Sequence, residues 1–281
     1  MAKYSIYLST CDTYSDCWDP FFTLFEKFWP TYDGKIYLSS EYKDYQRSNV
    51  TALKMCESHS CPKTRRVTWS KLIRWCLEAI PEDIILFMQE DFFLKGPVRY
   101  EYIESYCDLM LSDPDIKCIQ LTDLNGPGST ASNYEGLDLM LTHRQYRIAC
   151  QCALWRKEEL LTLLRDRESP WEWEHYGSSR SAVLGHTYLQ VNRDFVKQDI
   201  FEIVPYIYTG IIEGRWNPPV VPLFERNGIN MDFSIRGFYS RDNHSGTYNP
   251  SIKERLINRI KKARHKIDLF FIEQSVKTRG I

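Results

Sequence analysis

Two acidic segments carry the residue types that point to chemistry in this chain. The run 84–88 is apolar throughout and leads directly into Gln89, Glu90 and Asp91. Buried carboxylates are costly unless they are paired or ligated. Hard oxygen ligands suit Mg²⁺ or Mn²⁺, and such a cation can also hold a diphosphate. The segment therefore predicts a metal and diphosphate site, and the alternatives are an acidic turn at a strand end or an ion pair with an arginine.

The second segment, residues 168–174, alternates two tryptophans with Glu172 and Glu174. Aromatic faces suit sugar rings, and a carboxylate between apolar walls has the raised pKa that suits a general base. The alternative is plain packing, in which the tryptophans are buried and the glutamates face solvent or pair with Arg180.

The elements that must position these residues alternate along the first part of the chain. Short apolar runs predict strands, amphipathic stretches between them predict helices, and this alternation is typical of an α/β/α sandwich with a mainly parallel sheet. Residues 123–143 are expected to form a long loop. The expected strands are 3–9, 35–39, 50–55, 84–88, 116–121, 148–155 and 203–208, and the expected helices are 19–29, 68–80, 100–112 and a stretch ending at 164.

Polar residues follow the first two strands and open a helix. Thr10, Cys11 and Asp12 follow the first strand, Glu41 follows the second, and Ser70 begins the helix that leads to the acidic strand. In open α/β sheets, ligands bind beyond the carboxyl ends of the strands. No glycine-rich dinucleotide or P-loop pattern follows the first strand. A nucleotide would therefore be held through its base or ribose, by Asp12 or Glu41.

The formal net charge of -1 conceals a division of the chain. Residues 251–281 contain nine Lys or Arg and three Asp or Glu, a net +6, so residues 1–250 carry -7. Apolar residues at spacings of three or four make this tail a basic amphipathic helix, which favours contact with an anionic membrane. The alternative is a helix packed on its own domain or on a second subunit. Nucleic acid is not expected as a partner, because the body is acidic.

The expected division is a catalytic domain, residues 1–245, followed by a helical tail, residues 246–281. The chain shows no signal peptide and no transmembrane run. Its odd number of cysteines, nine, favours reduced thiols. We therefore expect a cytoplasmic protein at the inner face of the plasma membrane, with a homo-oligomer left open.

The order of these motifs resembles bacterial nucleotide-sugar-dependent glycosyltransferases of GT-A fold. The resemblance rests on the first-strand loop, the helix at Ser70, the acidic segment after the apolar strand, and the Trp–Glu segment, and it covers roughly residues 3–240. It implies a GT-A-like Rossmann-type sandwich. It also implies an enzyme that moves a sugar from a nucleoside-diphosphate sugar to a hydroxyl of a saccharide or lipid-linked acceptor, in cell-surface polysaccharide synthesis.

The resemblance also implies roles for particular residues. The acidic segment matches the family's DXD element with Gln89 in its first position, which makes Asp91 the expected metal ligand and makes strict dependence on Mn²⁺ or Mg²⁺ an open question. Glu174, or Glu172 as second choice, matches the acceptor-side base of inverting members. The donor contacts implied are Thr10, Cys11, Asp12, Glu41, Ser70 and Glu90.

Two other functions remain open from the sequence. A nucleotidyltransferase would use a related sheet, but it would need a glycine-rich basic phosphate loop after the first strand. A non-catalytic carbohydrate-binding or scaffold protein would keep the fold without turnover, and the Gln89 departure is compatible with it. Release of a nucleoside diphosphate from the donor distinguishes the transferase from both.

Overall fold

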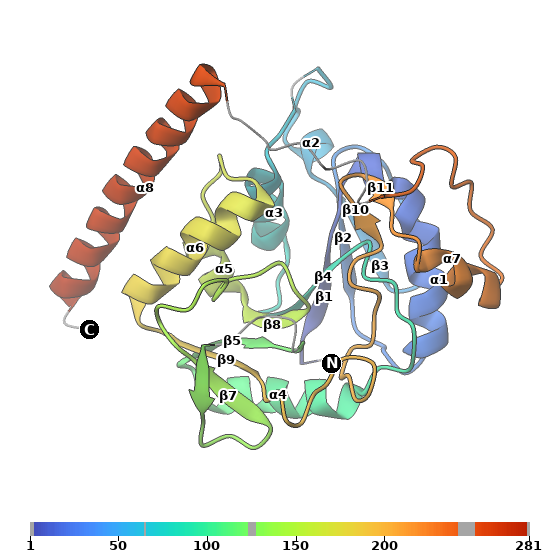
Figure 1. Ribbon diagram of the computed structural model, residues 1–281, viewed down its shortest axis with the longest axis horizontal. Coiled ribbons are helices and arrows are strands. Elements are labelled where there is room, and N and C mark those ends of the chain that lie inside the picture. Colours follow the sequence, from blue (N-terminus) through green and yellow to red (C-terminus); the bar gives the residue numbers. More distant parts are fainter. Residues whose placement is uncertain (1–2, 65, 123–127, 241–250, 280–281) are drawn as a thin grey trace.

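The computed structural model describes residues 3–64, 66–122, 128–240 and 251–279. Within them, helices cover both faces of one large twisted sheet (Figure 1). The α/β/α sandwich expected from the sequence is confirmed.

The central sheet has nine strands in the order β3-β2-β1-β4-β8-β5-β9-β7-β6. Seven strands run in one direction, and only β8 and β7 run the other way. The sheet is thus mainly parallel, as expected. Its strands are β1 (Ser5–Ser9), β2 (Ile36–Ser40), β3 (Val50–Lys54), β4 (Ile84–Gln89), β5 (Ile116–Gln120), β6 (Ser129–Ala131), β7 (Leu137–Met140), β8 (Ala153–Arg156) and β9 (Thr187–Val191).

The helices divide between the two faces of the sheet. One face is covered by α1, α4 and α7, and the other by α3, α5 and α6. A small hairpin, β10 (Ile211–Ile212) with β11 (Arg215–Trp216), lies outside the sheet. The helical elements are η1 (Asp12–Cys17), α1 (Trp18–Phe28), α2 (Met55–Ser58), α3 (Trp69–Ala79), α4 (Tyr100–Ser112), α5 (Lys157–Leu163), α6 (Pro170–Leu184), α7 (Val220–Arg226) and α8 (Ile252–Arg279).

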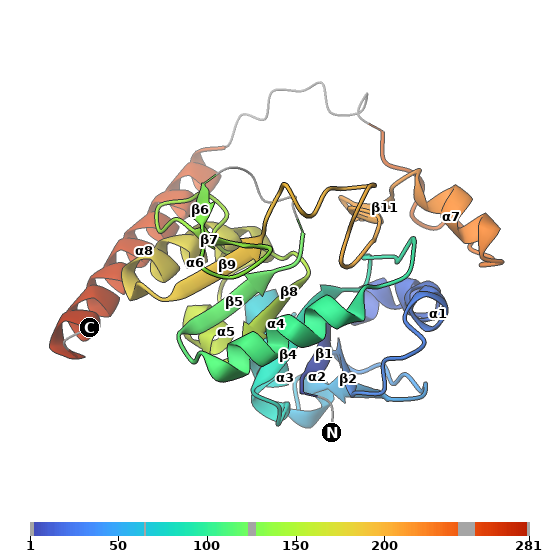
Figure 2. The same cartoon turned by 90° about the horizontal axis from the view of Figure 1, so that it is seen from below.

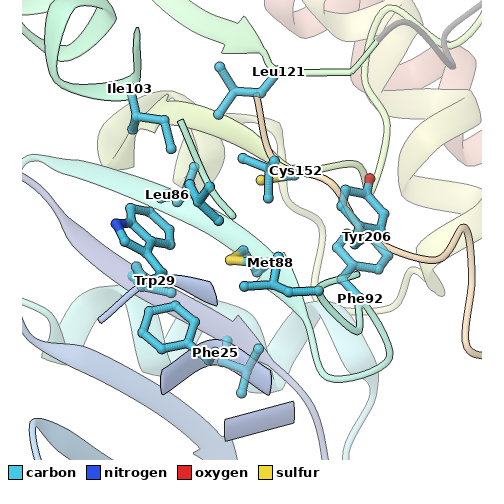
Figure 3. Packing of buried hydrophobic residues seen from close by; sticks show 14 of the residues in the cluster. Phe25, Trp29, Leu86, Met88, Phe92, Ile103, Leu121, Cys152 and Tyr206 are labelled. Atoms are coloured by element: carbon cyan, nitrogen blue, oxygen red, sulfur yellow. The ribbon is translucent and has the colours of Figure 1, made fainter. Parts of the chain in front are cut away.

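Strand β4 shows why its sequence is apolar without alternation. Leu86 and Met88 pack on the α1 and α4 side, whereas Ile85 and Phe87 pack on the α3 side. Successive side chains of a strand point to opposite faces, so a strand covered on both faces must be apolar throughout. Figure 3 shows Leu86 and Met88 among the aromatic side chains of the first of these two cores.

Several segments differ from the sequence-based expectation. The expected strand 148–155 is limited to β8, and β9 was not expected. Residues 203–208 form no strand of the sheet and make only an isolated bridge between Leu94 and Tyr206. Within the expected loop 123–143, β6 and β7 form an antiparallel hairpin at the edge of the sheet, while residues 123–127 lie outside the described residues. The Trp–Glu segment, which shows no clean period, begins the helix α6.

Local chemistry explains why α6 forms despite its weak amphipathic pattern. Ser169 is the N-cap, its side chain accepts from the backbone N–H of Glu172, and the Glu172 carboxylate accepts from the backbone N–H of Ser169. Pro170 opens the helix, and Gly185 closes it in a left-handed conformation. This reciprocal capping box and the Pro/Gly asymmetry fix both ends of the helix.

The basic tail is a single long helix, α8, that lies along the outside of α6 (Figures 1 and 2). Its predicted helical character is confirmed. Among the described residues, no helix is long and apolar enough to cross a membrane.

Candidate active site

The carboxyl ends of β1, β2 and β4 meet at one edge of the sheet. β1 lies between β2 and β4 and is parallel to both. The loops expected to hold a donor therefore start side by side: residues 10–12 after β1, Glu41 after β2, and Glu90 and Asp91 after β4. Adjacent parallel strands place these residues together although they are far apart in sequence.

Asp12 and Glu41 bind each other's loops. The Asp12 carboxylate accepts from the backbone N–H groups of Glu41 and Tyr42, both at 3.0 Å, and Glu41 Oε2 accepts from the backbone N–H of Asp12 at 2.5 Å. Burial raises the pKa of Glu41, and the N–H bond from Asp12 opposes that shift. The pair fixes the shape of the two strand-end loops, and the Asp12 oxygens are already engaged.

Thr10 and Ser70 are also part of the framework. Thr10 Oγ1 accepts from the Trp18 indole N–H at 2.9 Å, and the Thr10 backbone N–H donates to Ser39 Oγ. Ser70 is fully buried, and its hydroxyl has no hydrogen-bond partner among the described residues. In this conformation the Ser70 hydroxyl is closed to a ligand, in contrast to its expected donor contact.

The Glu90 carboxylate is the uncommitted acidic group at the strand ends. Its side chain is 9% exposed, and no side chain or backbone group of another described residue forms a hydrogen bond with it. Burial, and then the neighbouring Asp91 carboxylate, raise the pKa of Glu90 well above its usual value. Burial raises the pKa of the Cys11 thiol to about 11, and the charges of Glu41 and Glu90 add to the increase.

Asp91 has a different environment. Its Oδ2 accepts from the Thr209 hydroxyl and from the backbone N–H of Ile211, and its carbonyl accepts from the backbone N–H of Gly210. A Cβ at Gly210 would lie 2.3 Å from the Phe93 ring, so only glycine fits this close approach. Asp91 therefore fastens the segment 208–211 over the end of β4. Burial raises its pKa, and the Thr209 and Ile211 bonds counteract that shift.

The segment 208–211 presents Tyr208, a residue that the sequence analysis did not select. The Gln151 amide N–H donates to the Tyr208 hydroxyl at 3.0 Å, and the Tyr206 hydroxyl donates to Gln151 Oε1 at 2.8 Å. Tyr206 is buried, whereas the Tyr208 ring is 48% exposed. The apolar pattern of residues 203–208 predicts a strand of the sheet. That pattern does not indicate that Tyr208 lies near the strand ends.

Glu174 lies on the other side of Tyr208. Its Oε1 accepts from the backbone N–H of Cys150 at 2.7 Å. Burial raises the pKa of Glu174, and the bonds to Cys150 oppose the shift. The pKa of Tyr208 is raised by burial, and both Glu174 and Asp91 add to the increase. One continuous set of side chains thus runs from the end of β4 to the first turns of α6.

Glu172 is engaged at both oxygens. One accepts from the Ser169 backbone N–H at 2.9 Å, and the other accepts from the Lys261 ammonium at 2.8 Å. Burial alone would raise the pKa of Glu172, but Lys261 and Ser169 outweigh it, and the pKa is lowered. Helix capping and tail contact therefore explain Glu172 better than a role as base.

Arg236 is the second residue that the sequence analysis did not select. Its guanidinium donates to both carboxylate oxygens of Asp16, at 2.6 and 2.5 Å, and lies 4.5 Å from the centre of the Tyr14 ring. It is also close enough to Glu90 to lower that residue's pKa against the effect of burial. A residue more than two hundred positions from β1 thus places a fixed cation at the strand ends.

The acidic residues at the strand ends can be tested as a cation site. The described residues contain no group of three or more His, Cys, Asp or Glu side chains arranged to hold a metal ion. Mg²⁺ bound with a nucleotide commonly takes only one or two carboxylates, and phosphates and water complete its shell. The free Glu90 carboxylate beside Asp91 fits such a cation shared with a diphosphate, and it does not fit a cage made of protein ligands alone.

Comparisons with known proteins give matches of low identity among solved structures. No family model matches the chain, and no curated protein matches it. Among solved structures, S. aureus TarS 1-349 is 12% identical with a TM-score of 0.44, and the match covers 68% of this chain and 58% of that chain. The same protein in complex with UDP-GlcNAc matches with the same identity and TM-score, over 68% of this chain and 56% of that one. A mycobacterial protein is 13% identical with a TM-score of 0.39, over 67% and 65% of the two chains.

Proposed function

We propose that the protein is a glycosyltransferase that moves a sugar from a nucleoside-diphosphate sugar to a hydroxyl of a saccharide or lipid-linked acceptor. The observation that carries this proposal is the pair of carboxylates at the two ends of one site. Glu90 is buried and uncommitted at the strand ends, and Glu174 has a raised pKa on α6. Tyr208 and Gln151 lie between them.

The donor diphosphate would lie at the strand ends, with the loops shaped by Asp12 and Glu41 around the nucleoside. Departure of the nucleoside diphosphate develops negative charge, which needs a nearby cation. Arg236, although paired with Asp16, is close enough to lower the pKa of Glu90 and would supply part of this positive charge. Glu90 and Asp91 would hold Mn²⁺ or Mg²⁺, which when bound supplies further charge neutralisation.

The acceptor would lie on the α6 side. Oε1 of Glu174 is held by the Cys150 N–H, which leaves the other oxygen to take the proton from the acceptor hydroxyl. The acceptor oxygen then forms a bond to the anomeric carbon as the bond from that carbon to the diphosphate breaks, with inversion. Trp171 is 77% exposed on the first turn of α6 and offers an aromatic face to a sugar ring.

The proposal also covers the pathway, the location, the division of the chain and its assembly. It comprises a role in cell-surface polysaccharide synthesis, a cytoplasmic enzyme at the inner face of the plasma membrane, a catalytic unit of residues 1–245 with a tail of 246–281, and a homo-oligomer as the assembly to test.

The matched pair Glu174→Gln and Glu172→Gln tests the base. Loss of a general base lowers turnover by about 10²–10⁴-fold. We therefore expect Glu174→Gln to release nucleoside diphosphate from the donor at a rate lower by that factor. Glu172→Gln should stay within a few-fold of the native rate, because it removes only a cap and a tail contact. The measurement is diphosphate release across a panel of nucleotide sugars that includes UDP-GlcNAc, with and without Mn²⁺.

Three outcomes would contradict the proposal. Equal rates for the two variants would show that Glu174 is not the general base. Release of pyrophosphate from a nucleoside triphosphate would indicate a nucleotidyltransferase instead. Stabilisation by sugars without turnover of any donor would indicate a non-catalytic sugar-binding protein.

A further inference from the structure

The tail helix α8 has one side turned toward α6 and one side that is exposed. Lys261 pairs with Glu172, the His265 ring lies 4.4 Å from that of Tyr176, and Asp268 pairs with Arg165 at 2.9 Å. At 3.6 residues per turn, positions 261, 265 and 268 fall on one side of the helix. Leu269, Ile272 and Val276 are half-buried on the same side, so α8 is held on α6 by these polar contacts together with apolar packing.

The apolar stripe of α8 lies on the opposite side. At spacings of three and four it forms one continuous row, and its large members are exposed, Phe271 at 65%. An amphipathic helix normally buries its apolar residues against the core, so an exposed apolar row of this length has no cover among the described residues. The members of the stripe are Ile252, Leu256, Ile260, Ala263, Ile267, Phe270 and Phe271.

Basic residues flank the stripe on both edges. Arg259, Lys262 and Lys266 lie along one edge, and Lys253 and Arg264 along the other. All five are exposed, and none pairs with a carboxylate of the described residues. Asp268, by contrast, is on the side that faces α6. The outward surface of α8 is thus apolar at its centre and cationic at its borders.

We infer that this outward surface docks the protein on an anionic lipid bilayer. An apolar row in the acyl boundary with cations at headgroup level is the arrangement of an interfacial helix. The helix is 28 residues long, about 42 Å at 1.5 Å per residue, and Figure 1 shows it at the outer margin of the molecule, where a flat surface can reach it.

A second copy of the chain fits this surface less well. A two-fold contact places the same patch on itself, so the flanking cations of one helix would face those of the other. The acidic Asp268 that would complement them is turned inward and already paired with Arg165. Charge complementarity therefore favours anionic lipid over self-association.

Vesicle flotation of the full chain tests the inference without donor or acceptor, so it is independent of the proposed transfer chemistry. We expect the protein to float with vesicles of equal phosphatidylglycerol and phosphatidylcholine, and at least tenfold less with phosphatidylcholine alone. Phe270→Asp combined with Phe271→Asp should reduce the bound fraction at least tenfold. Lys262→Glu combined with Lys266→Glu should do the same at low salt.

Matched controls are Leu111→Asp, an exposed leucine on α4, and Lys35→Glu, an exposed lysine ahead of β2; both should float like the native protein. Circular dichroism of all variants should show an unchanged fold. Native-like flotation of the Phe270/Phe271 variant, or no flotation of the native chain, would overturn the inference. A native dimer that becomes a monomer in that variant, without lipid binding, would also overturn it in favour of self-association.

Discussion

At the scale of single residues, two adjacent carboxylates have different environments. Asp91 is bonded by Thr209 and Ile211, whereas Glu90 has no such partner among the described residues. Both residues lie in the turn that follows β4, and the segment 209–211 bonds to Asp91. The sequence motif alone favours Asp91 as the ligand, whereas the geometry leaves both oxygens of Glu90 and only Oδ1 of Asp91 without a bond from another described residue.

Replacing Glu90 with Gln should stabilise the fold while it removes activity. The pKa of Glu90 is higher in the fold than in the unfolded chain. Glu90 therefore stabilises the native state at pH values below its pKa in the unfolded chain. This contribution to stability is lost as pH rises through the pKa in the fold. At pH 7 we expect Glu90→Gln to gain about 1 kcal/mol or more in the free energy of unfolding. Denaturant titrations at pH 7 and pH 4.5 measure it, and a gain that is as large at pH 4.5 would contradict this cause.

The pH profile of turnover should report Glu174. A base acts only when ionised, and the pKa of Glu174 is raised above the 4.5 of an exposed glutamate. We therefore expect kcat/KM to fall as pH decreases, with a midpoint above 4.5. Glu174→Gln should abolish this acidic limb and leave a low, flat profile. An unchanged limb in that variant would assign the titration to another group.

At the scale of elements, α6 connects the site to the tail. Its positions 172 and 176 face α8, while Glu174 and Ser178 bond the backbone at 148–150. Residues two apart on a helix point in different directions, and residues four apart share a face. A segment that reads as an irregular Trp–Glu stretch is therefore a capped helix with one face toward the site and one toward α8.

Asp268→Asn should loosen α8 from α6. Arg180 is fully buried between Glu168 and Asp268, and Arg165 also pairs with Asp268. Hydrogen bonds to charged groups contribute about 1.5–3 kcal/mol each, so local opening of α8 should become at least tenfold more frequent. Hydrogen exchange of the α8 amides measures this. Glu273→Gln, an exposed acid on the same helix, is the control, and equal exchange in the two variants would contradict the role of Asp268.

At the scale of the whole molecule, the acidic and basic parts of the chain lie in different places. The -7 body contains the strand-end carboxylates, and the +6 tail is one helix along the outer side of α6. The acids of the body also hold the tail, through Glu172 and the cluster around Arg180. The acidic and basic parts are therefore joined along α6, and the exposed Arg259, Lys262 and Lys266 lie away from it.

The sequence by itself determined the layered α/β fold, the doubly covered strand β4, the acidic groups at its end and the helical tail. Each of these follows from local periodicity, because burial on one or two faces imposes a repeat on consecutive residues. The tertiary structure alone decided that the Asp91 carboxylate is bonded through Oδ2 whereas Glu90 has no such bond among the described residues, that Tyr208 and Arg236 lie near these carboxylates, and that an apolar row of α8 faces outward. These facts depend on contacts between residues far apart in the chain, and such contacts leave no periodic pattern in the sequence.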